Sequence, residues 1–228
     1  MKWIKRFKEL NGKVDRIHES RQTESEVAKI CRKYNIKING RERQSLWSWS
    51  LNSDGLVDVD GNVFIIGKKL EPSNKLTELP LKFGTITGSF ICYDNFLTSL
   101  EGAPHTVGGD FNVDNNELTS FEFAPKSVVG NFLAHNNNIR SFEGLVNIGG
   151  YLNCGGSNPV DKIWKIISNS DFQTHSMGRV QWDNEKMEFF NDLDIIRGDE
   201  IAIERLNFFL EEFGLDPVES VKGYKNIY

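Results

Sequence analysis

Cysteine is scarce in this chain, and no stretch of it is both long and apolar. The three cysteines, Cys31, Cys92 and Cys154, are far apart and odd in number, which favours reduced intracellular thiols over a disulfide framework. No apolar run approaches the roughly 18 residues that a membrane helix needs. The basic N-terminus contains Glu9 and alternating charges where a signal peptide needs an unbroken apolar segment, so we expect no export signal.

Motifs that carry catalysis are also missing from the sequence. It contains no HExxH, no phosphate-binding GxxxxGK[ST] and no GxGxxG. The four histidines are scattered along the chain, at His18, His105, His135 and His175. We therefore expect no enzymatic activity, no cofactor and no bound metal.

Two acidic segments are weak candidates for metal binding. The run DVDGN from Asp58 to Asn62 resembles the start of a calcium loop, but its twelfth position is Lys69, where such a loop needs Glu. A hairpin turn is the better interpretation of this run. Asp192, Asp194 and Asp199 are spaced along an acidic segment, for which solvation is the simpler explanation.

Charge is distributed unevenly along the 228 residues, whose net charge is −5. Residues 1–48 carry thirteen Lys or Arg and six Asp or Glu, whereas the remainder carries fourteen and twenty-six. One interpretation is two solvated surfaces that attract each other. The other is a basic head that contacts nucleic acid or an acidic partner.

A repeat of 21 residues dominates the central part of the chain. Four similar phrases each begin 21 residues after the last, at Leu76, Leu97, Leu118 and Ile139. A second marker, a glycine two residues before an apolar residue, keeps nearly the same step. It occurs as Gly88-Ser-Phe90, Gly109-Asp-Phe111, Gly130-Asn-Phe132 and Gly150-Tyr-Leu152. Coinciding periods of this kind indicate a repeat architecture.

Each unit follows the pattern apolar-x-apolar-x-x-Asn-x-apolar-x-x-apolar. In the second full copy, Phe111 and Val113 alternate as in a short strand with one buried face. Asn116 then turns the chain, and we expect its amide to bond backbone groups of the neighbouring unit. Leu118 and Phe121 direct the return segment inward. The prolines after Ala103 and Ala124 keep that segment extended or in a turn, and the glycines before each strand allow a sharp corner.

Non-repeat segments are expected to cover both ends of the array. We expect a helix from Thr23 to Tyr34 that begins with a Thr23–Glu26 capping box. Before it, Trp3, Ile4 and Phe7 predict a shorter amphipathic helix. Trp47 and Trp49 are expected to pack in the core. On the other side, Val160–Ile167 and Glu200–Phe213 are expected to be helices, and Arg179–Trp182 a strand. This organisation gives a basic, mainly helical cap at 1–50, a repeat solenoid at 51–160, and a C-terminal cap with an acidic helix at 161–228.

The run LTSLEGAPHTVGGDFNVDNNELTSFEFAP, from Leu97 to Pro125, resembles the leucine-rich-repeat-like proteins of tailed bacteriophages. Their repeats commonly follow the pattern GGxFxCxxNxLTSLEGAPxxV. The resemblance covers roughly residues 50–228 and implies an α+β fold: a short leucine-rich-repeat-type solenoid with a curved parallel sheet and helical caps at both ends. The chain departs from the pattern at the Glu71–Lys75 insertion, at Phe123 in place of glycine, and in the Gly40–Ser50 stretch. The resemblance implies no particular activity.

The residues between the inward positions of each strand are expected to face the concave side of the sheet. We expect this side to bind protein through a mixed apolar and acidic patch. The alternative interpretation is that these residues form ordinary strand surface exposed to solvent. The expected contact residues are Ile91, Tyr93, Asp110, Asn112, Asp114, Leu133, His135, Tyr151 and Asn153. Cys154 and His135 lie in neighbouring units but on opposite sides of their strands, so no catalytic pair is expected.

The combined features predict a non-enzymatic phage module that binds a host or phage protein in the host cytoplasm, such as an inhibitor of host machinery or of a defence component. The first alternative is a structural or assembly protein of the virion. The second is nucleic-acid binding through the basic segment Lys2–Arg43. The sheet face is not expected to take part in it, because an acidic surface does not suit phosphate. We expect no membrane association.

Overall fold

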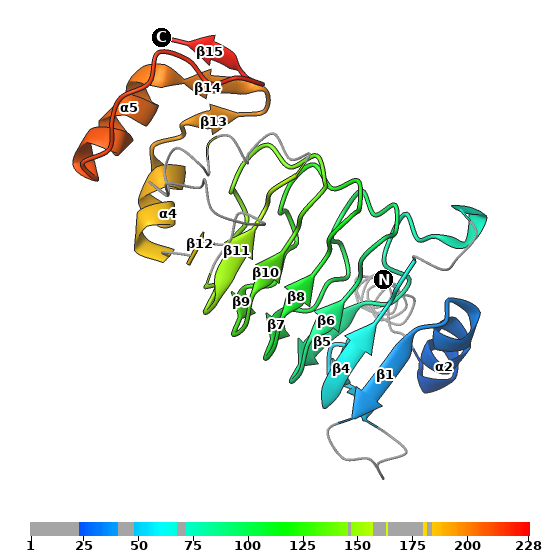
Figure 1. Cartoon of the computed structure of the whole chain (residues 1–228). Coiled ribbons are helices and arrows are strands. Elements are labelled where there is room, and N and C mark those ends of the chain that lie inside the picture. The colour runs from blue at the N-terminus through cyan, green and yellow to red at the C-terminus, as the bar shows by residue number, and fades with distance from the viewer. Residues whose placement is uncertain are drawn as a thin grey trace, which may run out of the picture.

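The computed structural model describes residues 23–40, 48–67, 72–145, 147–156, 163, 180–181 and 184–228. Within these ranges the fold is mixed α+β, with few helices and many short parallel strands (Figure 1). Several predicted elements lie outside the described residues: the segment with Trp3 and Phe7, the tryptophan Trp47, most of the helix predicted at Val160–Ile167, and part of the Glu71–Lys75 insertion.

The larger sheet has seven strands among the described residues, in the order β1-β4-β6-β8-β10-β11-β12. From β4 to β11 all neighbours are parallel, and β1 and β12 join the two ends in antiparallel fashion. Figure 1 shows the central strands side by side, each one repeat after the last. Their bounds are β1 Lys37–Gly40, β4 Gly61–Phe64, β6 Phe90–Ile91, β8 Phe111–Asn112, β10 Phe132–Leu133, β11 Tyr151–Asn153 and β12 Val180–Gln181.

A second sheet, which the sequence did not predict, runs through the return segments. Its five described strands have the order β2-β3-β5-β7-β9, and all pairs except β2–β3 are parallel. The prolines Pro104 and Pro125 are buried just before β7 and β9, where proline favours an extended chain. The strands are β2 Trp49–Leu51, β3 Val57–Val59, β5 Phe83–Ile86, β7 Thr106–Val107 and β9 Ser127–Val128.

The core is filled by the predicted inward residues of each repeat. Phe90, Phe111 and Phe132 are fully buried, and their ring centroids follow one another at 5.4 and 4.9 Å. Leu118 and Phe121 of the return segment are equally buried. β6, β8 and β10 therefore each add one aromatic ring to a continuous stack, and neighbouring rings stabilise each other beyond the area they bury.

The repeated asparagine makes the bonds that the sequence predicted. The amide of Asn116 donates to the Cys92 carbonyl of the preceding repeat at 2.9 Å, and its oxygen accepts from the Leu97 N–H at 3.0 Å. Asn95 and Asn137 make the equivalent pair of bonds. All three side chains are buried, so each asparagine satisfies backbone groups that would otherwise be costly to bury.

The structure corrects one expectation about turns and refines another. The run Asp58–Asn62 is not a hairpin, because β3 and β4 belong to different sheets and the chain crosses between them at Asp60. The chain bends at the glycines before each strand, as predicted, and close packing rather than a positive φ requires glycine there. A Cβ on Gly109 would lie 2.5 Å from Ser89 Oγ, and one on Gly130 would lie 2.5 Å from Asp110 Oδ1.

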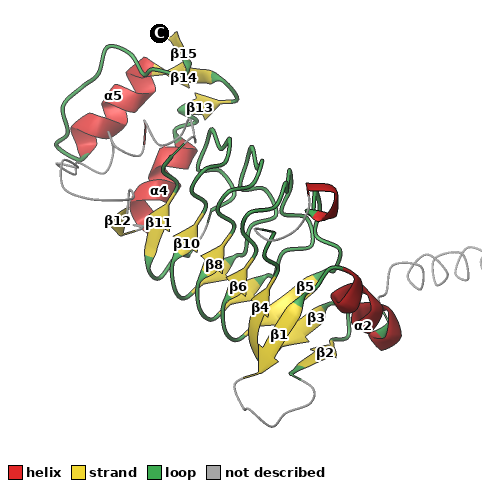
Figure 2. Ribbon diagram, turned by 45° about the vertical axis from the view of Figure 1, so that its right-hand side comes forward, coloured by secondary structure: helices red, strands yellow, loops and turns green. Residues whose placement is uncertain are grey.

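The N-terminal described segment begins with helix α2, Glu24–Lys33, beside β1 (Figure 2). The capping box is present as predicted: the Thr23 hydroxyl accepts from the Glu26 N–H, and the Glu26 carboxylate accepts from the Thr23 N–H. Val27 is fully buried, and Ile30 and Cys31 pack against the core. Trp49 is half-buried and also packs against the core, as predicted.

The C-terminal part is more elaborate than predicted. Helix α4, Asn184–Asp192, was missed, and so was a three-stranded sheet of β13 Ile196–Arg197, β14 Glu200–Ala202 and β15 Lys225–Ile227. The helix predicted from Glu200 begins three residues later than expected. Glu200–Ala202 form β14, and α5 then spans Ile203–Glu212. Ile201 is fully buried between Ile196 and Asn226, and this pairing outweighs the helical pattern that continues through it.

Candidate protein-binding face

The predicted contact residues lie on the outer face of the seven-stranded sheet, opposite the buried aromatic stack. The predicted register is confirmed: Ile91, Asn112, Leu133 and Asn153 are paired in sequence across β6, β8, β10 and β11. Ser89, Asp110, Asn131 and Tyr151 precede this row, and Tyr93, Asp114, His135 and Gly155 follow it. The outer face therefore consists of three rows that cross the strands.

The first row holds neighbouring repeats together through side-chain acceptors. Asn62 Oδ1 accepts from the Ser89 N–H at 2.7 Å, and Ser89 Oγ accepts from the Asp110 N–H at 3.0 Å. Asp110 Oδ1 accepts from the Asn131 N–H at 2.8 Å, and Asn131 Oδ1 from the Tyr151 N–H at 3.2 Å. The carboxylate of Asp110, expected to contact a partner, is thus engaged inside the protein.

Asp114, in the third row, has a similar internal role. Its Oδ1 accepts from the His135 N–H at 2.6 Å. Burial raises the pKa of the Asp114 carboxyl, and the nearby Asp94 acts in the same direction, while the bond from His135 partly opposes them. The face therefore offers a partner fewer available carboxylates than the sequence implied, because Asp110 and Asp114 both bond the next repeat.

The two asparagines of the middle row also bond their own strands. Asn112 Oδ1 accepts from the Asp114 N–H at 2.9 Å and is half-buried. Asn153 Oδ1 accepts from the Gly155 N–H at 3.2 Å, and only 3% of Asn153 is exposed. Placing Asn153 among the contact residues was therefore wrong, since a buried side chain offers a partner nothing to bind.

The remaining predicted residues, Ile91, Tyr93, Leu133, His135 and Tyr151, are half-buried on this face. The structure adds two apolar residues from β4 and its continuation. Phe64 pairs with Ile91, and Ile66, 37% exposed, lies two residues further along. Val63 and Ile65, which alternate with them, are buried, so the alternation in the sequence could have assigned Phe64 and Ile66 to the outer face.

A basic residue flanks the apolar end of the face. β1 runs antiparallel to β4, and this pairing sets the exposed Lys37 directly opposite Phe64. Residues directly opposite on antiparallel strands point to the same side of the sheet. The outer face therefore changes along the sheet, from Lys37 with Phe64 and Ile91 at one end to polar bonded residues in the middle.

No group of acidic, histidine and cysteine side chains suited to a metal ion occurs among the described residues. Asp58 Oδ1, in the run considered for calcium, accepts from the Thr85 N–H at 2.7 Å and from Asn52 Nδ2 at 3.2 Å. Cys154 is fully buried, whereas His135 lies on the outer face. The described part of the chain thus brings no predicted reactive groups together.

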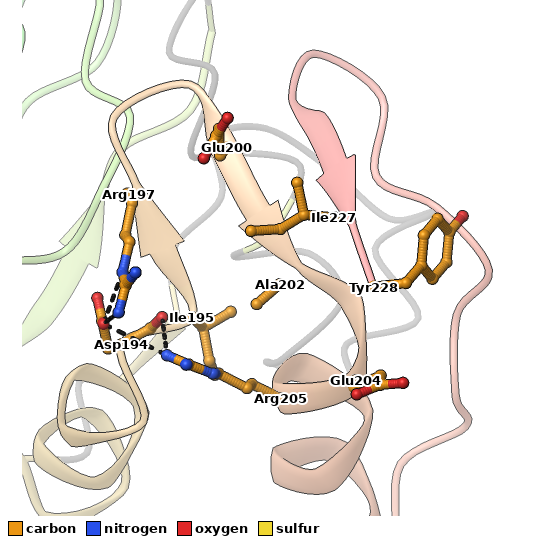
Figure 3. A pocket seen from close by; sticks show the side chains of 9 residues that line it. All are labelled: Asp194, Ile195, Arg197, Glu200, Ala202, Glu204, Arg205, Ile227 and Tyr228. Atoms are coloured by element: carbon orange, nitrogen blue, oxygen red, sulfur yellow. Dashed lines mark hydrogen bonds and ion pairs between the residues drawn. The ribbon is translucent and has the colours of Figure 1, made fainter.

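A hollow of about 200 Å³ lies between β13, β14 and the start of α5 (Figure 3). Its two arginines, Arg197 and Arg205, both bond the carboxylate of Asp194. The bond from Arg197 holds the pKa of Asp194 below its usual range. Because both arginines are paired with Asp194, and Glu200 and Glu204 also line the hollow, we do not assign it an anionic ligand.

Comparison of the chain with protein-family models, with curated proteins and with solved structures gave no match. The resemblance to the phage proteins therefore stays a prediction from the sequence pattern alone. None of the helices in the described ranges is long and apolar enough to cross a membrane.

Proposed function

We propose that this protein is a leucine-rich-repeat-type solenoid of a tailed bacteriophage, and that it binds a protein partner on its outer sheet face without catalysing a reaction. The parallel strands at 21-residue steps and the asparagine bonds between repeats support this architecture. In this proposal α2 caps one end of the array and α4 with α5 caps the other, since terminal repeats need a covering to stay soluble.

The observation that carries the proposed function is the contrast within the outer face. Its polar side chains are engaged in bonds between and along the strands, whereas its apolar ones remain partly accessible to solvent. Phe64, Ile66 and Ile91 gather at one end, and Leu133 and Tyr151 lie further along. A row of apolar side chains on a rigid, hydrogen-bonded sheet is a suitable docking surface, because binding it orders few additional side chains.

The size of the face fits a protein rather than a small molecule. Five parallel strands spaced at about 4.8 Å give a face roughly 20–25 Å wide. Such a face buries on the order of 800 Å² per partner, the standard size of a specific interface. A helix, an extended segment or the edge of a small domain matches it. We propose a host or phage protein as the partner, with inhibition of a host or defence protein as the outcome.

The test uses charged substitutions on the face, with matched controls elsewhere. Tagged protein with Phe64→Glu, Tyr93→Glu and Leu133→Glu is compared with wild type in affinity purification from infected cells, followed by mass spectrometry. Thr98→Glu and Thr119→Glu serve as controls, since both threonines are exposed in return segments. We expect the face variant to lose a partner that wild type and control both retain. A partner retained equally by all three proteins would refute the assignment of this face.

Mass spectrometry of purified virions separates the main alternative from this proposal. A virion component is found in the particle at a fixed stoichiometry, whereas an intracellular inhibitor is absent from it. Presence in the particle, together with unchanged particle assembly in the face variant, would count against a role on host proteins.

A further inference from the structure

Helices α4 and α5 lie at the end of the molecule farthest from α2 (Figure 1), and two aromatic side chains of this region are exposed. Phe208 is 48% exposed and Phe213 is 41% exposed. Their ring centroids lie 6.3 and 6.1 Å from that of the half-buried Phe189 on α4. We name Phe189, Phe208 and Phe213 the aromatic patch. Clustered exposed rings of this kind mark an interaction surface more often than isolated ones do.

Exposed acidic side chains share the two helices with the aromatic patch. The two helices carry six acidic residues, all exposed, and only two basic ones. Of the basic residues, Arg205 bonds Asp194 and the Leu193 carbonyl. Lys186 Nζ lies 4.7 Å from the centre of the Phe213 ring, which shows that a cation is accommodated there. The acidic residues are Glu185, Glu188, Asp192, Glu204, Glu211 and Glu212.

A surface that combines aromatic rings with acidic side chains suits a segment that combines basic and apolar side chains. Residues 1–13 of this chain have that composition: MKWIKRFKELNGK. They carry five basic residues and one acidic residue, and Trp3, Ile4 and Phe7 recur at the three-to-four-residue spacing of one helix face. Basic side chains next to aromatic ones allow contact with both the carboxylates and the rings.

The arrangement of the sheet favours a second copy of the chain as the source of this segment. α2 lies beside β1, and α4 follows β12 at the opposite edge of the seven-stranded sheet (Figure 2). Six strand spacings of about 4.8 Å separate these edges by about 29 Å, before the helices themselves are reached. Residues 14–22 span at most about 31 Å when fully extended. A connection within one chain would therefore have to be almost fully stretched, whereas one between two copies would not.

We propose that the aromatic patch binds residues 1–13 of a second copy, so that copies associate head to tail. The contact joins two different surfaces, and it therefore leaves an unused head and an unused patch at the ends of every assembly. This inference does not depend on the proposed function, because the outer sheet face takes no part in it. Association is expected to rise with protein concentration and to weaken with salt, since carboxylates and cations contribute to it.

Sedimentation of full-length proteins over a range of concentrations, after nuclease treatment, tests the proposal. A patch variant carries Phe208→Asp and Phe213→Asp, and a head variant carries Lys5→Glu, Arg6→Glu and Lys8→Glu. Val129→Asp is the control, because Val129 is 63% exposed but lies on the repeats. We expect wild type and control to associate, and each of the other variants to associate at least tenfold more weakly. Circular dichroism confirms that each variant is folded.

Mixing the two variants gives the decisive measurement. The head variant keeps an intact patch and the patch variant keeps an intact head, so the mixture is expected to form a one-to-one complex that neither variant forms alone. Wild-type protein that remains monomeric at every concentration would overturn the proposal, and so would a mixture that shows no complex. Association that disappears on nuclease treatment would assign the head to nucleic acid and equally overturn it.

Discussion

The side-chain amide of Asn116 donates to the carbonyl of Cys92, at 2.9 Å and 24 residues earlier in the chain. The same side chain accepts from the Leu97 N–H, and it also donates to the Val113 carbonyl of its own repeat. It is 7% exposed. One buried amide therefore satisfies backbone groups of two successive repeats and fixes their relative position.

Replacing Asn116 by alanine is expected to destabilise the protein by about 2–4 kcal/mol, because buried backbone groups lose their partners. Urea denaturation measures the change in the free energy of unfolding. Asn138→Ala is the matched control, since Asn138 is exposed and only its backbone N–H bonds the preceding repeat. Equal stability of the two variants would show that water replaces the Asn116 bonds at little cost.

Phe123 adopts a positive φ of 63°, a conformation that disfavours residues with a Cβ. The equivalent positions in the neighbouring repeats are Gly102 and Gly144, at 89° and 91°. Phe123 is 54% exposed, so it gains little from burial. Phe123→Gly is expected to stabilise the protein by about 0.5–1 kcal/mol. The backbone strain removed from the folded state is larger in free energy than the conformational entropy that glycine adds to the unfolded state.

Differential scanning calorimetry checks this expectation as an increase in Tm of about 1–4 °C. The reverse change supplies the control. Gly102→Ala is expected to lower Tm, because its Cβ would lie 2.8 Å from the Leu81 carbonyl oxygen in a backbone conformation unsuited to alanine. A lower Tm for Phe123→Gly would mean that the exposed ring makes a stabilising contact that outweighs the strain.

Asp114 is expected to make stability depend on pH. Burial raises the pKa of its carboxyl in the folded protein, so the folded state binds the proton more tightly than the unfolded state. The stability this contributes is fully present below the pKa of the unfolded carboxyl, about 3.9, and is lost as pH rises through the folded pKa. At neutral pH the ionised Asp114 is therefore a cost.

Asp114→Asn keeps the acceptor for the His135 N–H and removes the buried charge. We expect this variant to be at least as stable as wild type at pH 7, and its advantage to shrink toward pH 4. Asp114→Ala is expected to be less stable than wild type by about 1–3 kcal/mol, since the His135 N–H loses its acceptor. Urea denaturation at several pH values measures these differences in the free energy of unfolding. An Asp114→Asn variant less stable than wild type at pH 7 would contradict the conclusion that burial is the main influence on the Asp114 carboxyl.

The three thiols are expected to react with a disulfide reagent at very different rates. Cys92 and Cys154 are fully buried, and burial raises the pKa of Cys92 to about 12. Cys31 is half-buried, and its pKa is also raised. Because the thiolate is the reactive form, the native protein is expected to react slowly at Cys31 alone, and at all three sites after denaturation. Rapid reaction in the folded Cys31→Ser variant would instead reveal opening of the repeats.

Part of the outer face was predictable because it follows from alternation in short strands. Once Phe90 and Phe111 are assigned inside, Ile91 and Asn112 must point outward, and the 21-residue period places them in register. The same alternation does not reveal which polar side chains turn back to the protein. Asp110, Asp114 and Asn153 looked accessible, and their bonds depend on where the neighbouring backbone N–H groups lie.

The sequence by itself determined the period, the inward residues and the bonding role of the asparagines, because each follows from local chemistry repeated at fixed spacing. Only the tertiary structure decided the second sheet, because β7 and β9 each contain a single buried apolar residue, Val107 or Val128, and so show no apolar alternation. The tertiary structure also brought Phe190 against Phe142, 5.7 Å between ring centroids, and joined β14 to β13 and β15. These contacts join residues far apart in the chain or compete with a local helical pattern, and no single segment encodes them.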